Sequence, residues 1–116
     1  MVYTEFLLDE FLKAMDDIGR YGFKKHGEHS FQAHRKRGDR DREGLARLSA
    51  AGFHHHAIEH LNAYLRGEPH DHFHSRRHQL AAAAFNVMME FYFAGLEDER
   101  RQENVRDFQG GVRETN

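Results

Sequence analysis

Apolar residues recur at intervals of three and four along three long segments of this 116-residue chain. That spacing places them on one face of an α-helix, whereas a half-buried strand needs alternating apolar and polar residues. No segment alternates for long enough to predict a strand. The single proline, Pro69, interrupts the pattern between the second and third segments. The sequence therefore predicts an all-α chain whose three main helices form a small bundle.

The first helix is expected from about Tyr3 to Ile18, and the glycines that follow it, in RYGFKKHGEHSF, predict a frayed helix end and a structured loop. The charged run AHRKRGDRDRE, residues 33–43, is interpreted as a solvated connector, with a phosphate-binding arm as the alternative. The second helix is expected from about Arg42 to Arg66 and is stopped by Gly67.

The third helix is expected to follow Ser75, which is a suitable N-cap. Its predicted buried stripe is Leu80, Ala84, Val87, Met88 and Phe91, with Leu96 as a further candidate. The tail from about Gln102 is expected to be frayed, so the folded domain is predicted to span residues 1–101 and the tail residues 102–116. Because the apolar face is rich in Phe and Met, we expect a homodimer or higher homo-oligomer to complete the bundle.

Composition limits the functions that this chain can have. It contains no cysteine, so disulfides and thiolate metal sites are excluded. A formal net charge of -2 gives no general case for nucleic-acid binding. Acidic residues interrupt the apolar opening segment, so neither a secretory signal nor a membrane span is expected there, and a cytoplasmic location without membrane contact is predicted.

Histidine is unusually frequent, with 11 in the chain, and four of them stand in HHHAIEH, residues 54–60. His56 and His60 are four residues apart, so both can project from one helix face as metal ligands. Glu59 stands beside them as a third ligand or as a base for bound water. The alternative interpretation is a polar helix face in a wet groove.

Carboxylates and cations elsewhere suggest a site for phosphate and metal. Glu68 and Asp71 follow the end of the second helix, and loop carboxylates can hold Mg²⁺. Lys24 and Lys25 stand between glycines, where they can meet phosphate oxygens. For each group the alternative is a solvated turn.

Asn86 shares one stripe of the last helix with His78. An asparagine buried there without a partner would cost about 1–3 kcal/mol. It is therefore expected either to fix helix packing or to bind a ligand.

These segments together resemble the MazG-like proteins of phages and bacteria, in particular dATP/dGTP diphosphohydrolases. The resemblance rests on the order of YGFKKHGEHSF, HAIEHLNAYLRGEPHD and HQLAAAAFNVMMEFY, and it covers residues 18–92. It implies an all-α pyrophosphohydrolase that converts a (deoxy)nucleoside triphosphate to a monophosphate and pyrophosphate with Mg²⁺, or with Mn²⁺. Carried over to this chain, it implies Glu68 and Asp71 on the metal, Lys24 and Lys25 on phosphates, and His60 and Asn86 on base, sugar or water. Glu59 and His56, which the HHHAIEH spacing singles out, are expected to join the metal ligands.

The chain departs from the family at several positions. Glu59 replaces a common arginine, either His78 or Gln79 must serve as the family's histidine, and there is no EExxE helix. Two alternatives therefore stand beside the enzyme. One is a non-catalytic protein of phage–host defence that binds or sequesters a nucleotide. The other is a His-rich protein that binds Zn, Ni, Cu or Fe.

Overall fold

The structure is a computed structural model, and it describes residues 4–27, 30, 33, 35 and 49–113. In these ranges a short 3-10 helix, η1 (Thr4–Phe6), precedes three α-helices, α1 (Asp9–His26), α4 (Ala50–Leu65) and α5 (Arg76–Arg113), and no strand occurs. This confirms the prediction of an all-α chain with three main helices for the described part of the sequence. The expected start of the second helix at Arg42 lies outside the described residues.

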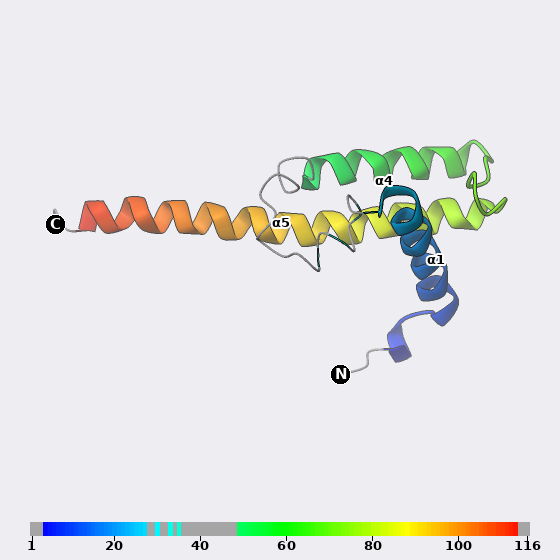
Figure 1. Ribbon diagram of the computed structural model, residues 1–116, viewed down its shortest axis with the longest axis horizontal. Coiled ribbons are helices and arrows are strands. Elements are labelled where there is room, and N and C mark those ends of the chain that lie inside the picture. Colours follow the sequence, from blue (N-terminus) through cyan, green and yellow to red (C-terminus); the bar gives the residue numbers. More distant parts are fainter. Residues whose placement is uncertain (1–3, 28–29, 31–32, 34, 36–48, 114–116) are drawn as a thin grey trace.

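α1 and α4 both pack against the first half of α5 (Figure 1). α4 runs antiparallel to α5, as two contacts show: the backbone N–H of Ala50 donates to Glu97 at 3.2 Å, and His60 meets Gln79 at 2.7 Å. α1 crosses α5 steeply on another side, and the C-terminal part of α5 extends beyond both neighbours (Figure 1). The molecule is therefore elongated, with principal extents of 62 × 32 × 31 Å.

α1 continues to His26, so the expectation that the first helix ends near Ile18 was wrong. Gly19 is buried within the helix. Of the three glycines in this segment, Gly19, Gly22 and Gly27, only Gly27 takes a positive φ, of 55°, and its N–H bonds to the Phe23 carbonyl. Acidic residues in the first turn and basic residues in the last turn complement the helix dipole. The extra two turns carry Tyr21 and Lys25 toward α4.

Both ends of α4 follow from the local sequence. At its start, the Ser49 hydroxyl oxygen accepts a hydrogen bond from the Gly52 N–H at 3.1 Å. At its end, Gly67 has a φ of 81°, and its N–H bonds to the Tyr64 carbonyl while the Glu68 N–H bonds to the Ala63 carbonyl. This pair of bonds is a Schellman motif, which confirms Gly67 as the predicted stop.

The buried face of α5 differs from the predicted stripe. Val87, Met88 and Phe91 are exposed. The core is formed by a neighbouring row together with residues of α1 and α4: Ile18, Ala50, Ala81, Ala82, Phe85, Met89 and Phe93. Two apolar rows run along this helix, and helical spacing alone does not reveal which one faces inward.

α5 is helical to Arg113, beyond the boundary drawn at residue 101, and the division into a domain and a tail stays a prediction. No helix in the described ranges is long and apolar enough to cross a lipid bilayer.

Candidate functional site

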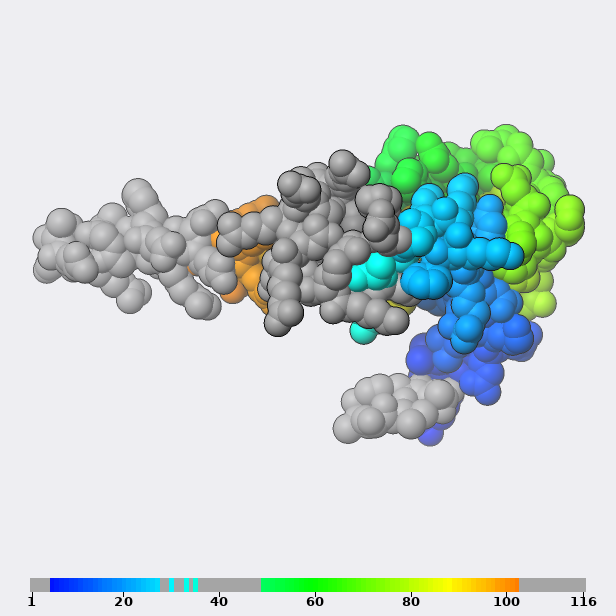
Figure 2. All heavy atoms as spheres, viewed as in Figure 1, coloured from blue at the N-terminus to red at the C-terminus, as the bar shows by residue number. Residues whose placement is uncertain are grey.

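A cavity of about 510 Å³ lies where α1, α4, α5 and the turn after α4 meet. In the space-filling view, atoms of α1 sit against those of α4 and of this turn (Figure 2). Six residues singled out in the sequence line the cavity together, although they come from four separate segments: Lys25, His56, Glu59, His60, Asp71 and Asn86. The remainder of its lining is largely aromatic and apolar: Ile18, Tyr21, Phe53, Phe85 and Met89.

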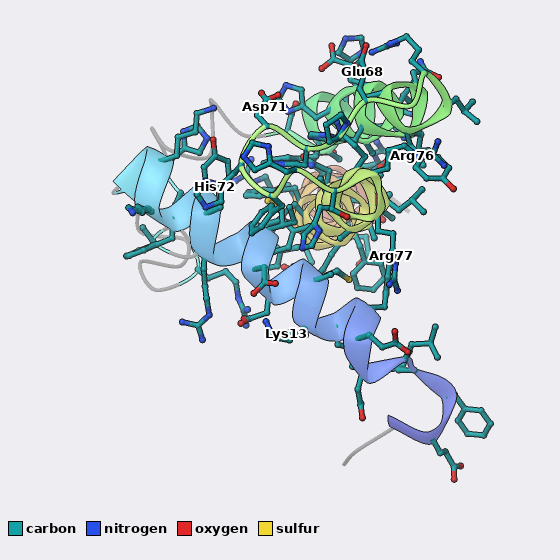
Figure 3. All side chains as sticks on the ribbon, turned by 90° about the vertical axis from the view of Figure 1, so that its right-hand side faces the viewer. Lys13, Glu68, Asp71, His72, Arg76 and Arg77 are labelled. Atoms are coloured by element: carbon teal, nitrogen blue, oxygen red, sulfur yellow. The ribbon has the colours of Figure 1, made fainter. Side chains whose placement is uncertain are left out.

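Three of the sequence-predicted residues do not line this cavity. Lys24 is exposed on α1, one position before Lys25. Glu68 is held by Arg66, whose Nε donates to the carboxylate at 2.9 Å, and this bond lowers the pKa of Glu68 below its usual value. Figure 3 shows Glu68 at the outer end of α4, away from α1. It lines a second hollow of about 450 Å³, which shares Glu59 and Asp71 with the first.

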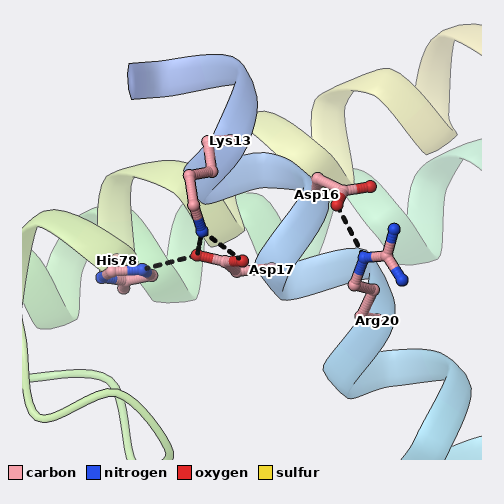
Figure 4. A network of polar contacts seen from close by, with 5 residues as sticks. All are labelled: Lys13, Asp16, Asp17, Arg20 and His78. Carbon is pink, nitrogen blue, oxygen red and sulfur yellow. Dashed lines mark hydrogen bonds and ion pairs between the residues drawn. The ribbon is translucent and has the colours of Figure 1, made fainter. Parts of the chain in front are cut away.

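His78 lies on a different face, between α5 and α1. Its Nε2 is 3.7 Å from Asp17, which also accepts hydrogen bonds from Lys13 (Figure 4). Its ring stacks on Phe73 with centroids 4.3 Å apart, and its Nδ1 is buried without a hydrogen-bond partner. His78 therefore belongs to the packing of α1 against α5, in a hollow separate from the cavity.

A partly buried hydrogen-bond chain fixes the ring of His60. The amide nitrogen of Gln79 donates to the Pro69 carbonyl at 3.1 Å, so the amide oxygen of Gln79 faces the Nδ1 of His60 at 2.7 Å. An oxygen can only accept, so Nδ1 carries the proton. In the neutral ring, Nε2 then keeps its lone pair and is able to accept a proton or bind a metal ion.

His70 is buried in the turn that follows α4 and is held in its neutral form. Its Nδ1 accepts a hydrogen bond from the His72 backbone N–H at 3.2 Å, which requires that nitrogen to be unprotonated. Burial lowers the pKa of His70, and the neighbouring His60, whose ring stacks at 5.9 Å, lowers it further. The cavity wall thus contains two adjacent imidazoles, and a positive charge on His60 makes protonation of His70 less favourable.

Aromatic stacking fastens this turn to α1. Tyr21 stacks on His72 with ring centroids 4.5 Å apart and meets His70 edge to face at 5.6 Å. Lys25 reaches over the Tyr21 ring at 5.9 Å from its centroid. The extended end of α1 therefore positions both the turn and Lys25, which lines the cavity.

Asn86 is buried, and its amide nitrogen donates to the Ala82 carbonyl one turn earlier at 2.8 Å. The bond stays within α5, so it does not join two helices, and Asn86 also lines the cavity. Whether Asn86 contacts a ligand or serves helix packing stays a prediction.

The cavity does not contain a ready-made metal chelate. Within the described ranges, no three His, Asp or Glu side chains converge closely enough to hold a metal ion. Glu59 instead lies 3.1 Å from His55, one turn earlier on α4, and Glu90 lies 3.0 Å from His54. A metal ion would need further ligands from water or from a bound molecule.

Sequence reasoning missed three residues of this region. The glycines around Tyr21 predict a helix end and a loop, whereas Tyr21 lies within α1. Gln79 was considered only as a substitute for a histidine, although its two hydrogen bonds orient His60. His70 lies in the turn of Glu68 and Asp71, for which a solvated turn is the alternative, and its burial follows from tertiary packing that no local signal reveals.

Neither protein-family models, nor curated proteins, nor solved structures give a match to this chain. The class of site is therefore defined by geometry alone. It is a mixed polar and aromatic cavity between helices, with carboxylate, imidazole, amide and ammonium groups on its wall.

Proposed function

We propose that the chain is a nucleotide pyrophosphohydrolase of the MazG-like type, which converts a (deoxy)nucleoside triphosphate to a monophosphate and pyrophosphate. The observation that carries this proposal is the gathering of Lys25, Glu59, His60, Asp71 and Asn86 around one cavity. Lys25, His60, Asp71 and Asn86 match three separate motifs of the family resemblance, and Glu59 stands next to His60 in the second of them. Their convergence is a property that the motifs alone do not require.

The lining of the cavity suits the two ends of a nucleotide. Aromatic and apolar side chains such as Phe53 and Phe85 supply surfaces on which a base can stack. Lys25 supplies a positive charge for phosphate oxygens, and Asn86 supplies an amide for a sugar or base. The second hollow, which shares Glu59 and Asp71 with the first, extends the space available to a long ligand.

The carboxylates of the cavity lining suit a Mg²⁺ ion that is bound together with substrate phosphates. It commonly binds through one or two carboxylates together with substrate phosphates, and it keeps several waters. Among the described residues that line the cavity, Glu59 and Asp71 carry carboxylates, so they would hold the ion, whereas Glu68 is engaged by Arg66. The bound ion would neutralise charge on the phosphate oxygens, and Mn²⁺ has similar ligand preferences. The neutral Nε2 of His60 is able to accept the proton of an attacking water.

The proposal is tested by incubating purified full-length chain with each nucleoside triphosphate and Mg²⁺ or Mn²⁺, and separating the products by ion exchange. We expect a monophosphate and pyrophosphate in equal amounts. Asp71→Asn should lower kcat/KM by roughly 100-fold or more, because charge stabilisation at a reacting phosphate is lost. If no nucleoside triphosphate is hydrolysed with either metal, the proposed enzymatic function is refuted.

Two control variants separate the cavity from general effects. Asp16→Asn removes an exposed carboxylate that pairs with Arg20 on the outer face of α1, and it should leave turnover unchanged. Glu68→Gln tests whether Glu68 binds the metal, as the family resemblance implies, or lies outside the site, as its position outside the cavity indicates. We expect it to lower kcat/KM far less than Glu59→Gln, since Glu68 lies outside the cavity.

One observation favours the alternative of a nucleotide-binding protein without turnover. The Glu59 carboxylate, which the reaction would need on the metal, is paired with His55 at 3.1 Å. Calorimetry that gives tight nucleotide binding to a chain without hydrolysis would establish this alternative in place of the enzyme.

We also propose, independently of the reaction, that the chain self-associates. Exposed apolar side chains on α4 and α5 support this proposal.

A further inference from the structure

Two rows of exposed apolar side chains follow α4 and α5 on the side away from the cavity. Ile58, Leu61 and Leu65 are exposed along α4, and Val87 and Phe91 are exposed along α5. Val87 stands two positions before the cavity residue Met89, which places it about 160° around the helix from Met89. Ile58 stands in the same relation to His56.

The α5 row has the spacing of a helix-pairing seam. Leu80, Ala84, Val87 and Phe91 follow one another at four, three and four residues, which keeps them in line over several turns. Phe91 is 82 % exposed, the highest value among the large apolar side chains described. Charged residues stand at both ends of the row, Arg76 at the start and Asp98 with Glu99 at the far end.

The row can pair with the same row of a second copy when the two α5 helices are antiparallel and the two-fold axis passes between Val87 and Met88. In that arrangement the bulky Phe91 of one copy meets the small Ala84 of the other, and Leu80 meets Gly95. Nothing lies within 4 Å of a Cβ built on Gly95, so there is room above it. A surface that fits its own copy under a two-fold rotation is what a closed symmetric dimer requires.

The charges agree with the reversed arrangement. Arg76 meets the acidic pair Asp98 and Glu99 of the second copy, and the same contact recurs at the opposite end. In a parallel arrangement Arg76 would instead meet Arg76. Arg76 lies over the Tyr64 ring at 4.9 Å, at the edge where the α4 row adjoins the α5 row, and Figure 3 shows it at the end of the molecule where α5 begins.

We propose that the occupant of this surface is a second copy of the chain, with the two α5 helices antiparallel and the α4 rows flanking them. This interface does not depend on the proposed function, so failure of the hydrolysis assay would leave it untouched.

Sedimentation equilibrium of the full-length chain tests the interface. We expect a dimer at micromolar concentration. Phe91→Asp should raise the dissociation constant by roughly 30-fold or more, because a charge replaces a central aromatic contact. Phe6→Asp is the matched control, since Phe6 is 80 % exposed but lies on η1, outside the row, and it should leave the dimer intact. Circular dichroism checks that both variants keep their helices.

A charge exchange tests the antiparallel direction. Arg76→Glu alone should weaken the dimer by placing like charges together, and adding Asp98→Arg to it should restore the association.

Because the chain has no cysteine, Val87→Cys next to the two-fold axis should also form a disulfide-linked dimer when oxidised glutathione is added, whereas Lys24→Cys on α1 should not. A monomeric wild-type chain at 100 µM, roughly a hundred times the expected dissociation constant, would overturn the proposal. So would a dimer unaffected by Phe91→Asp, or no rescue by the charge exchange.

Discussion

At the scale of single residues, His70 links protonation to folding. Its neutral ring accepts a backbone hydrogen bond from His72 and is packed against His60 and Tyr21. Burial and the charge of His60 lower the pKa of His70 below the ordinary value of 6.5, while Asp71 acts in the opposite direction. The unfolded chain therefore takes up a proton at this position at a higher pH than the folded chain does.

The stability of the protein should consequently decline in mildly acidic solution. The contribution of His70 is complete above pH 6.5 and is lost as the pH falls below that value toward the lowered pKa of the folded state. For one proton the slope is at most about 1.4 kcal/mol per pH unit. Urea unfolding between pH 8 and pH 5 measures it. His70→Asn, which keeps an acceptor but does not titrate, should give a shallower decline, and identical slopes would contradict the assignment.

The sequence was informative about the residue types at this site and less so about their partners. Lys25, Glu59 and Asn86 were recognised because charged and amide groups on an apolar background are conspicuous. Glu68 was chosen on the same grounds, but Arg66, only two residues earlier, engages it. Lys24 and Lys25 are indistinguishable in composition, and only the phase of α1 decides which one lines the cavity.

At the scale of elements, helix ends were predictable where one residue type has a specific backbone role. Gly67 stops α4 as expected. Gly19 and Gly22 did not stop α1, because glycine is tolerated inside a helix when packing compensates its cost. The orientation of α5 was missed for another reason: apolar residues lie on two of its faces, and the choice between them depends on where α1 and α4 dock.

The start of α4 offers a direct test of capping. Ser49→Ala removes the hydroxyl that accepts from the Gly52 N–H, and it should lower the free energy of unfolding by about 1 kcal/mol. Ser75→Ala is the control, since Ser75 supports the start of α5 through its backbone carbonyl, which bonds to the His78 N–H and survives the change. Denaturant titration of both variants measures the difference, and equal losses would count against the cap.

At the scale of the whole molecule, the cavity joins segments from both halves of the sequence. A ligand that fills it should stabilise α1, α4 and α5 together, by about 2.7 kcal/mol at a concentration 100 times its dissociation constant. We expect a non-hydrolysable triphosphate analogue with Mg²⁺ to raise the Tm of the full chain. Lys25→Ala should reduce this rise and Lys24→Ala should preserve it, because only Lys25 lines the cavity. Scanning calorimetry with the analogue measures both, and equal responses would contradict the placement.

Met89 faces inward and Val87 faces outward on the same stretch of α5. If two copies join through their outer faces, the two α5 helices lie at the centre of the dimer. The two cavities then lie on opposite sides of this helix pair and open in opposite directions, and each is lined by residues of one chain. Such a molecule would fill its cavities independently, with neither copy lending a side chain to the other.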